Sequence, residues 1–168
     1  MDKTKSGKLP KYGYGPIYLL ISLILTVLSL LYFNEMKIFQ SGIIKNYYLK
    51  KCFLSLSIIS MIAGISIWCI AVLPSKGIRY KLEHGELEVG GIYSITRNPI
   101  YSGIYFFLLG IQMLTYNLFI FILSFIIYQF LVILLINTEE KWCLNKFGKK
   151  YEEYCTKVNR IIPWFPKK

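Results

Sequence analysis

The sequence predicts an all-α integral membrane protein, a bundle of about four transmembrane helices with a cytoplasmic C-terminal helix. Three observations lead to this fold class. Hydrophobic residues make up 55% of the 168 residues, and the mean hydropathy of +0.47 is high for a soluble domain. The hydrophobic residues are collected in four long apolar runs. Aromatic residues reach 17%, and they are typically enriched where a protein meets the membrane–water boundary.

The apolar runs cover approximately residues 17–33, 53–73, 100–114 and 118–136. A spanning helix needs about 20 apolar residues, so the second and fourth runs qualify outright. The first run is just long enough, and the third is short unless it includes the residues before it. Four lysines precede the first run, but no small-residue cleavage site follows it, so we expect an uncleaved span. Only Thr115, Tyr116 and Asn117 separate the last two runs, which predicts a tight helical hairpin.

The chain is basic, with a formal net charge of +11. Its lysines and arginines lie between and beyond the apolar runs, which favours anionic lipid headgroups as partners and argues against nucleic acid. With four spans, both tails and the middle segment share one side of the membrane. That side carries most of the 20 basic residues, so the positive-inside rule places both termini of this multi-pass protein in the cytoplasm.

No metal site is expected from the histidine and cysteine content. His84 is the single histidine, and the four cysteines contain no CxxC pair. We expect the four thiols to be free and buried. Small residues such as Gly64 allow spanning helices to pair, but the sequence leaves the oligomeric state undecided.

The segment GIYSITRNPIYSG, residues 91–103, precedes the predicted hairpin. Its Pro99 predicts a helix start, with Asn98 as the N-cap. A helix N-terminus beside Arg97 is able to bind a carboxylate or a phosphate, and Tyr93 and Tyr101 offer rings that pack on a flat ligand. The same pattern also fits an ordinary capped helix start at the membrane surface.

The segment NTEEKWCLNKFGKKYEEYCTKVNRIIP, residues 137–163, follows the hairpin. Acids at the membrane edge are costly unless solvated or paired, so Glu139 and Glu140 indicate function. They would also oppose the dipole at a helix C-terminus, unless that helix continues into the cytoplasm. The apolar spacing predicts a helix over 139–154, interrupted by Gly148. A surface helix with solvated acids is the simpler alternative.

The two segments are expected to meet, because both ends of a helical hairpin lie on the same side of the membrane. Together they predict a cytoplasm-facing pocket at the bilayer surface. The pocket offers an arginine and backbone N–H groups for an anion, a glutamate for a cation, and aromatic rings. S-adenosylmethionine, with its carboxylate, positive centre and adenine, suits such a pocket.

The segments resemble G-x-Y-x-x-x-R-H-P-x-Y-x-G and E-E-x-x-L-x-x-x-F-G-x-x-Y-x-x-Y-x-x-x-V-x-R-x-x-P, two motifs of the isoprenylcysteine carboxyl methyltransferase and phospholipid methyltransferase superfamily. The resemblance implies an integral membrane enzyme that moves a methyl group from S-adenosylmethionine to a hydrophobic or lipid-like acceptor. That acceptor, a carboxylate or an amine, would enter from the bilayer. We therefore divide the single membrane domain, 1–168, into a basic tail at 1–15, two N-terminal spans at 17–73 and a methyltransferase-like core at 85–163.

Carried onto this chain, the resemblance assigns Glu139, Glu140 and Arg160 to catalysis. It assigns to cofactor binding Tyr93, Arg97, Asn98, Pro99, Tyr101, Gly103, Glu139, Glu140 and Lys157. Asn98 stands where many members of the superfamily have histidine, so no imidazole proton is available there. Lys157 stands where arginine is frequent, and it keeps the charge but loses the bidentate fork.

Two alternatives remain open at this point. Membrane sterol reductases share a similar Arg-His-Pro-x-Tyr motif and use NADPH, but they are usually much longer than 168 residues. A small non-catalytic membrane scaffold would keep the fold without the chemistry, and the retained Arg97, Glu139 and Glu140 argue against it.

Overall fold

The computed structural model describes residues 14–33, 35–73, 81 and 84–166, so most of the predicted basic tail lies outside the described residues. The described part of the chain is helical, with one isolated β-bridge between Ile43 and Asn117. Its elements are α1 (Gly15–Leu28), the π-turn η1 (Ser29–Phe33), α2 (Lys37–Gln40), α3 (Tyr47–Val72), the short 3-10 helix η2 (Gly91–Ser94), α5 (Pro99–Met113), α6 (Leu118–Asn137), α7 (Glu139–Phe147) and α8 (Lys149–Lys157). The all-α prediction is confirmed for these residues.

Three of the described helical stretches are long and apolar enough to cross a membrane, namely Gly15–Tyr32, Tyr47–Val72 and Leu118–Phe147. They correspond to the first, second and fourth predicted spans. The third predicted span is α5, which has 15 residues and is shorter than the about 20 that a crossing requires. Pro99 begins this helix, and the turn with a left-handed Tyr116 (φ +52°) follows its end. A fourth crossing stays a prediction.

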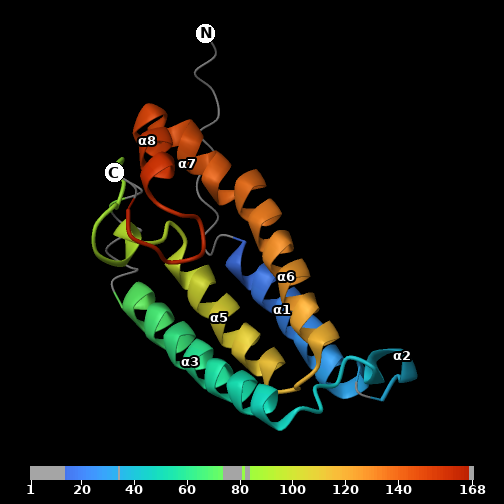
Figure 1. The fold of residues 1–168 in the computed structure, drawn as a ribbon. Coiled ribbons are helices and arrows are strands. Elements are labelled where there is room, and N and C mark those ends of the chain that lie inside the picture. Colours follow the sequence, from blue (N-terminus) through green and yellow to red (C-terminus); the bar gives the residue numbers. More distant parts are fainter. Residues whose placement is uncertain (1–13, 34, 74–80, 82–83, 167–168) are drawn as a thin grey trace.

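Helix α5 packs against α3 along glycines (Figure 1). A Cβ on Gly103 would lie 2.8 Å from the backbone oxygen of Gly64, and a Cβ on Gly64 would lie 2.5 Å from the backbone nitrogen of Phe107. The hydroxyl of Ser57 donates to the carbonyl of Gly110 at 2.8 Å. Small residues and interhelical hydrogen bonds hold helices together in lipid. Apolar side chains give no hydrophobic driving force there, because the lipid tails are equally apolar.

The predicted burial of all four cysteines is wrong for two of them. Cys52 and Cys69 are exposed on α3, while Cys143 and Cys155 are half-buried. The reason is that α3 buries only a narrow stripe of small residues: Ser57, Gly64 and Ala71. Large apolar side chains elsewhere on this helix are exposed, as expected for a surface that faces lipid.

A second packing layer joins α1, α5 and α6. Its buried core consists of Tyr18, Tyr101, Tyr105, Ile127, Leu131, Leu135 and Ile161. Ile161 belongs to the C-terminal segment, so the chain end is part of the bundle core. Deeper in the bundle, Gln112 donates to the hydroxyl of Thr26 at 3.0 Å and ties α5 to α1.

The predicted hairpin of α5 and α6 is confirmed. The amide oxygen of Asn117 caps α6 by accepting from the backbone N–H of Phe119 at 3.0 Å, and its Nδ2 donates to the carbonyl of Phe39 at 3.1 Å. Both outer ends of the hairpin therefore reach one end of the bundle, where α7 and α8 also lie, while α2 lies at the opposite end (Figure 1).

Candidate functional site

A break at Thr138 separates α6 from α7 and decides where the two adjacent glutamates lie. Thr138 leaves helical geometry (φ −122°, ψ −91°), and its hydroxyl donates to the carbonyl of Leu134 at 2.6 Å. Asn137 satisfies the carbonyl of Ile133 in the same way at 2.8 Å. Glu139 and Glu140 consequently occupy the first turn of α7, the favourable end of a helix for acids, rather than a helix C-terminus. The interruption predicted at Gly148 is confirmed, with φ +53° between α7 and α8.

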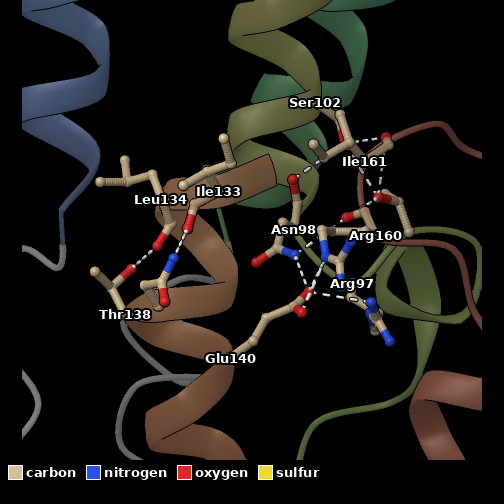
Figure 2. A network of polar contacts seen from close by, with 11 residues as sticks. Arg97, Asn98, Ser102, Ile133, Leu134, Thr138, Glu140, Arg160 and Ile161 are labelled. Atoms are coloured by element: carbon tan, nitrogen blue, oxygen red, sulfur yellow. Dashed lines mark hydrogen bonds and ion pairs between the residues drawn. The ribbon is translucent and has the colours of Figure 1, made fainter. Parts of the chain in front are cut away.

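Glu140 is buried between two guanidinium groups (Figure 2). Arg160 donates from Nε to both carboxylate oxygens at 2.9 Å, and Arg97 Nη2 lies 3.1 Å from Oε1. The side chains of Arg97 and Glu140 are 7% and 9% exposed, and that of Arg160 is 29% exposed. One carboxylate thus lies between two cations in a site that water barely reaches, and it offsets only one of their two positive charges. Losing the acid would therefore be costly.

Asn98 occupies the predicted N-cap position of α5, and Pro99 is the first helical residue. The side chain of Asn98, however, does not cap the helix. Its amide donates instead to Glu140 Oε1 at 3.3 Å and to the carbonyl of Arg160 at 3.1 Å. Asn98 therefore joins the carboxylate to the C-terminal segment, a task that needs the two donors of an amide.

Backbone hydrogen bonds join the C-terminal segment 159–164, called the strap below, to the 91–103 motif. Arg97 N donates to Asn159 O at 2.9 Å, Asn98 N to Arg160 O at 3.2 Å, and Trp164 N to Ile95 O at 3.0 Å. This pairing brings Arg160 onto Glu140, and it confirms that the two motif segments meet.

Two hydroxyl groups that the sequence analysis did not single out also form hydrogen bonds to the C-terminal segment. The fully buried Thr96 and Ser102 both donate to the carbonyl of Ile161, Thr96 at 3.2 Å. Their signal in the sequence is only a threonine and a serine within the motif, which is also typical of ordinary loops.

Glu139 points to a different environment from Glu140. It accepts hydrogen bonds from the hydroxyl of Tyr101 and, at 3.1 Å, from the backbone N–H of Tyr14 at the start of α1. Within the described residues no lysine or arginine forms an ion pair with Glu139, whereas Glu140 has two. Glu139 also lines a cavity that Glu140 does not line.

This cavity has a volume of about 150 Å³ and lies at the α7–α8 end of the bundle. Six of the predicted site residues line it: Tyr93, Arg97, Asn98, Pro99, Tyr101 and Glu139. The sequence analysis missed other lining residues, among them Leu87, Glu88, Cys143, Tyr151 and Tyr154. The tyrosines of α8 were visible only as an apolar helix face, and Glu88 follows no pattern.

The remaining predicted residues lie outside the lining of this cavity. Glu140 and Arg160 stand behind it and contact Arg97 or each other. Gly103 lies inside the α3–α5 contact, where Trp68 leaves no space for a Cβ, so its place is explained by helix packing. Lys157 is exposed at the end of α8.

The polar groups of the cavity are of mixed charge. Glu88 forms an ion pair with Lys81 at 2.7 Å, and hydrogen bonds from Lys81 and from the Gly90 N–H hold the pKa of Glu88 below its usual value. Burial, followed by the charges of Glu88 and Glu139, raises the pKa of Tyr93 to about 12, so this phenol stays protonated. Arg97 Nε is buried and has no hydrogen-bond partner among the described residues. A buried donor without an acceptor is costly, and this nitrogen is covered by protein atoms.

The helical bundle and its apolar surface indicate an integral membrane protein, with a cavity at one end of the bundle. The chain matches the family model for phospholipid methyltransferase over residues 50–150, and it belongs to that family. It is also 38% identical over 81 residues to a protein-S-isoprenylcysteine O-methyltransferase of Schizosaccharomyces pombe. That match covers 48% of this chain and 34% of the relative, so the aligned region is about a third of the relative's length. No solved structure gives a significant match.

Proposed function

We propose that this protein is a methyltransferase that moves a methyl group from S-adenosylmethionine to a hydrophobic or lipid-like acceptor, a carboxylate or an amine, at the cytoplasmic bilayer surface. One observation carries the proposal. A single cavity is lined by Glu139, which lacks a cationic partner among the described residues, and by Arg97, whose buried Nε lacks an acceptor there. A ligand with both a positive and a negative group would satisfy both once the cavity widens and uncovers Nε.

The donor and acceptor groups of the cavity fit this cofactor. The guanidinium group of Arg97 would hold its carboxylate, Glu139 would face its positive charge, and Tyr93 and Tyr154 supply flat apolar walls. The cavity of about 150 Å³ is smaller than the roughly 300–1,000 Å³ of typical ligand sites. We therefore expect it to widen when the cofactor binds.

The bound cofactor would supply an activated methyl group, and the protein would supply alignment and electrostatics. Glu140 and Arg160 would act by fixing Arg97, since they contact its guanidinium or each other rather than the cavity. Tyr101 and the Tyr14 N–H would orient the Glu139 carboxylate. A carboxylate acceptor needs no base, whereas an amine acceptor must lose a proton, for which Glu139 is the candidate.

An apolar groove of about 480 Å³ supports a hydrophobic acceptor. It runs over α5 between α1 and α3 and is lined by residues such as Leu19, Leu23, Trp68 and Ile104. The groove residue Ile104 lies one helical turn from Ile100, which lines the cavity. An acceptor whose hydrocarbon chain lies in the groove would thus bring its reactive end towards Glu139. Both termini are proposed to be cytoplasmic, as the distribution of basic residues predicts.

The decisive experiment is calorimetric titration of the detergent-purified, lipid-supplemented protein with S-adenosylmethionine and S-adenosylhomocysteine. We expect saturable binding that Glu139→Gln weakens at least tenfold for S-adenosylmethionine, and that Arg97→Ala abolishes. Lys149→Ala is the matched control, because Lys149 is exposed and does not line the cavity, and it should bind as the wild type does. Binding of NADPH without binding of S-adenosylmethionine or S-adenosylhomocysteine would refute the proposal in favour of a reductase.

A further inference from the structure

Glu88 is a second carboxylate of the cavity, contributed by the segment that precedes η2. Both of its oxygens accept hydrogen bonds: Lys81 Nζ lies 2.7 Å from Oε2, and the Gly90 N–H lies 2.9 Å from Oε1. These two contacts fix the carboxylate at the cavity wall. The side chain of Lys81 is 50% exposed and that of Glu88 is 20% exposed, so the ammonium lies towards water while the carboxylate lies inward.

Among the described residues, two carboxylates and one guanidinium group line the cavity. Glu88 and Glu139 both contribute negative charge, and both act on Tyr93, which lies in the same wall. Arg97 is the basic residue among the lining side chains and is paired with Glu140. Glu88 is paired with Lys81, but that ammonium is half exposed, so water screens its charge more than it screens the carboxylate. A ligand with a positive centre is therefore favoured between the two carboxylates.

We propose that Glu88 is a specificity-determining residue that makes the site prefer S-adenosylmethionine, whose sulfonium is positively charged, over S-adenosylhomocysteine, whose thioether is neutral. This inference rests on the proposed methyltransferase function. Methyl transfer breaks the bond between sulfur and the methyl carbon, leaves its electron pair on sulfur, and forms a new bond to a lone pair of the acceptor. Because the sulfonium becomes a neutral thioether, the attraction to Glu88 and Glu139 ends with the reaction. Glu88 thereby favours binding of S-adenosylmethionine and release of S-adenosylhomocysteine.

The test compares two ligands that differ at the sulfur. Affinities of the full chain for S-adenosylmethionine and S-adenosylhomocysteine are measured by calorimetry in the wild type, Glu88→Gln and Glu88→Asp. We expect Glu88→Gln to weaken S-adenosylmethionine about threefold, the size of a partly exposed charge interaction, and to leave S-adenosylhomocysteine unchanged. Glu88→Asp should restore most of the preference. Glu86→Gln is the control, because Glu86 is exposed and does not line the cavity.

Equal weakening of both ligands in Glu88→Gln would overturn the inference and leave Glu88 with a structural role only. An unchanged affinity for both ligands would overturn it as well. In either case the wild type still binds, and the proposed function stands. Failure of the wild type to bind either ligand would instead refute the proposed function, and this inference with it.

Discussion

Replacing Glu140 by glutamine should destabilise the protein strongly, because it leaves two guanidinium groups without a counter-charge. The side chains of Arg97 and Glu140 are 7% and 9% exposed, and removing one partner of a buried ion pair costs roughly 3–5 kcal/mol. Arg160 is 29% exposed and is partly solvated, so we take about 3 kcal/mol, the lower end of that range. For a chain of this length the melting temperature should fall by about 6–12 °C.

The assay is intrinsic-fluorescence thermal unfolding of the purified protein in detergent, with Glu139→Gln as the matched variant. Glu139 has no ion pair within the described part of the chain, so its variant should melt within about 3 °C of the wild type while losing cofactor affinity. Adding Arg160→Gln to Glu140→Gln should recover part of the stability, because one uncompensated cation is removed. A shift below about 2 °C for Glu140→Gln, or additive losses in the double variant, would refute the structural role of Glu140.

Three further outcomes are expected. Gly103→Ala should lower the melting temperature by several degrees, because its methyl group would lie 2.8 Å from backbone atoms of Gly64 and Trp68; an unchanged value would argue against the close α3–α5 contact. Ser102→Ala should cost about 1 kcal/mol and speed tryptic cleavage after Arg160, since Ser102 holds the carbonyl of Ile161; unaltered cleavage would contradict the strap. The pKa of Glu88 is lowered, so its charge is present above the usual glutamate pKa and is lost only below it. The preference for S-adenosylmethionine over S-adenosylhomocysteine should therefore stay constant from about pH 8 to pH 5, and a decline near neutral pH in this titration would assign the preference to another group.

The sequence predicted the features that depend on chain topology and local geometry. The three-residue connection 115–117 forces a hairpin, and a hairpin returns its two flanking segments to one end of the bundle. Pro99 forces a helix start. These rules do not depend on which side chains pack together, which is why the meeting of the motif 91–103 with the segment 137–163 could be expected.

The sequence predicted six of the residues that line the cavity, but it did not predict the rest of the lining or which motif residues face away from it, because these depend on helix rotations that no pattern encodes. Gly103 belongs to the motif, but the direction in which it faces on α5 places it against α3. Asn98 has the right position for a cap, but stronger acceptors, the carboxylate of Glu140 and the carbonyl of Arg160, take its amide. Glu88 is brought to the cavity by an irregular segment with no periodicity.

The break at Thr138 places two neighbouring acids, Glu139 and Glu140, in different environments. Successive residues of a helix differ in direction by about 100°, so Glu139 faces the cavity and Glu140 faces the arginines. Glu140 is held between two guanidinium groups, while Glu139 forms no ion pair within the described part of the chain. Inserting a single residue at this junction would leave the composition of the acidic pair intact but turn α7 as a whole. The number of residues between α6 and the Glu139–Glu140 pair therefore sets the direction of each carboxylate. This spacing matters as much as the presence of the two acids.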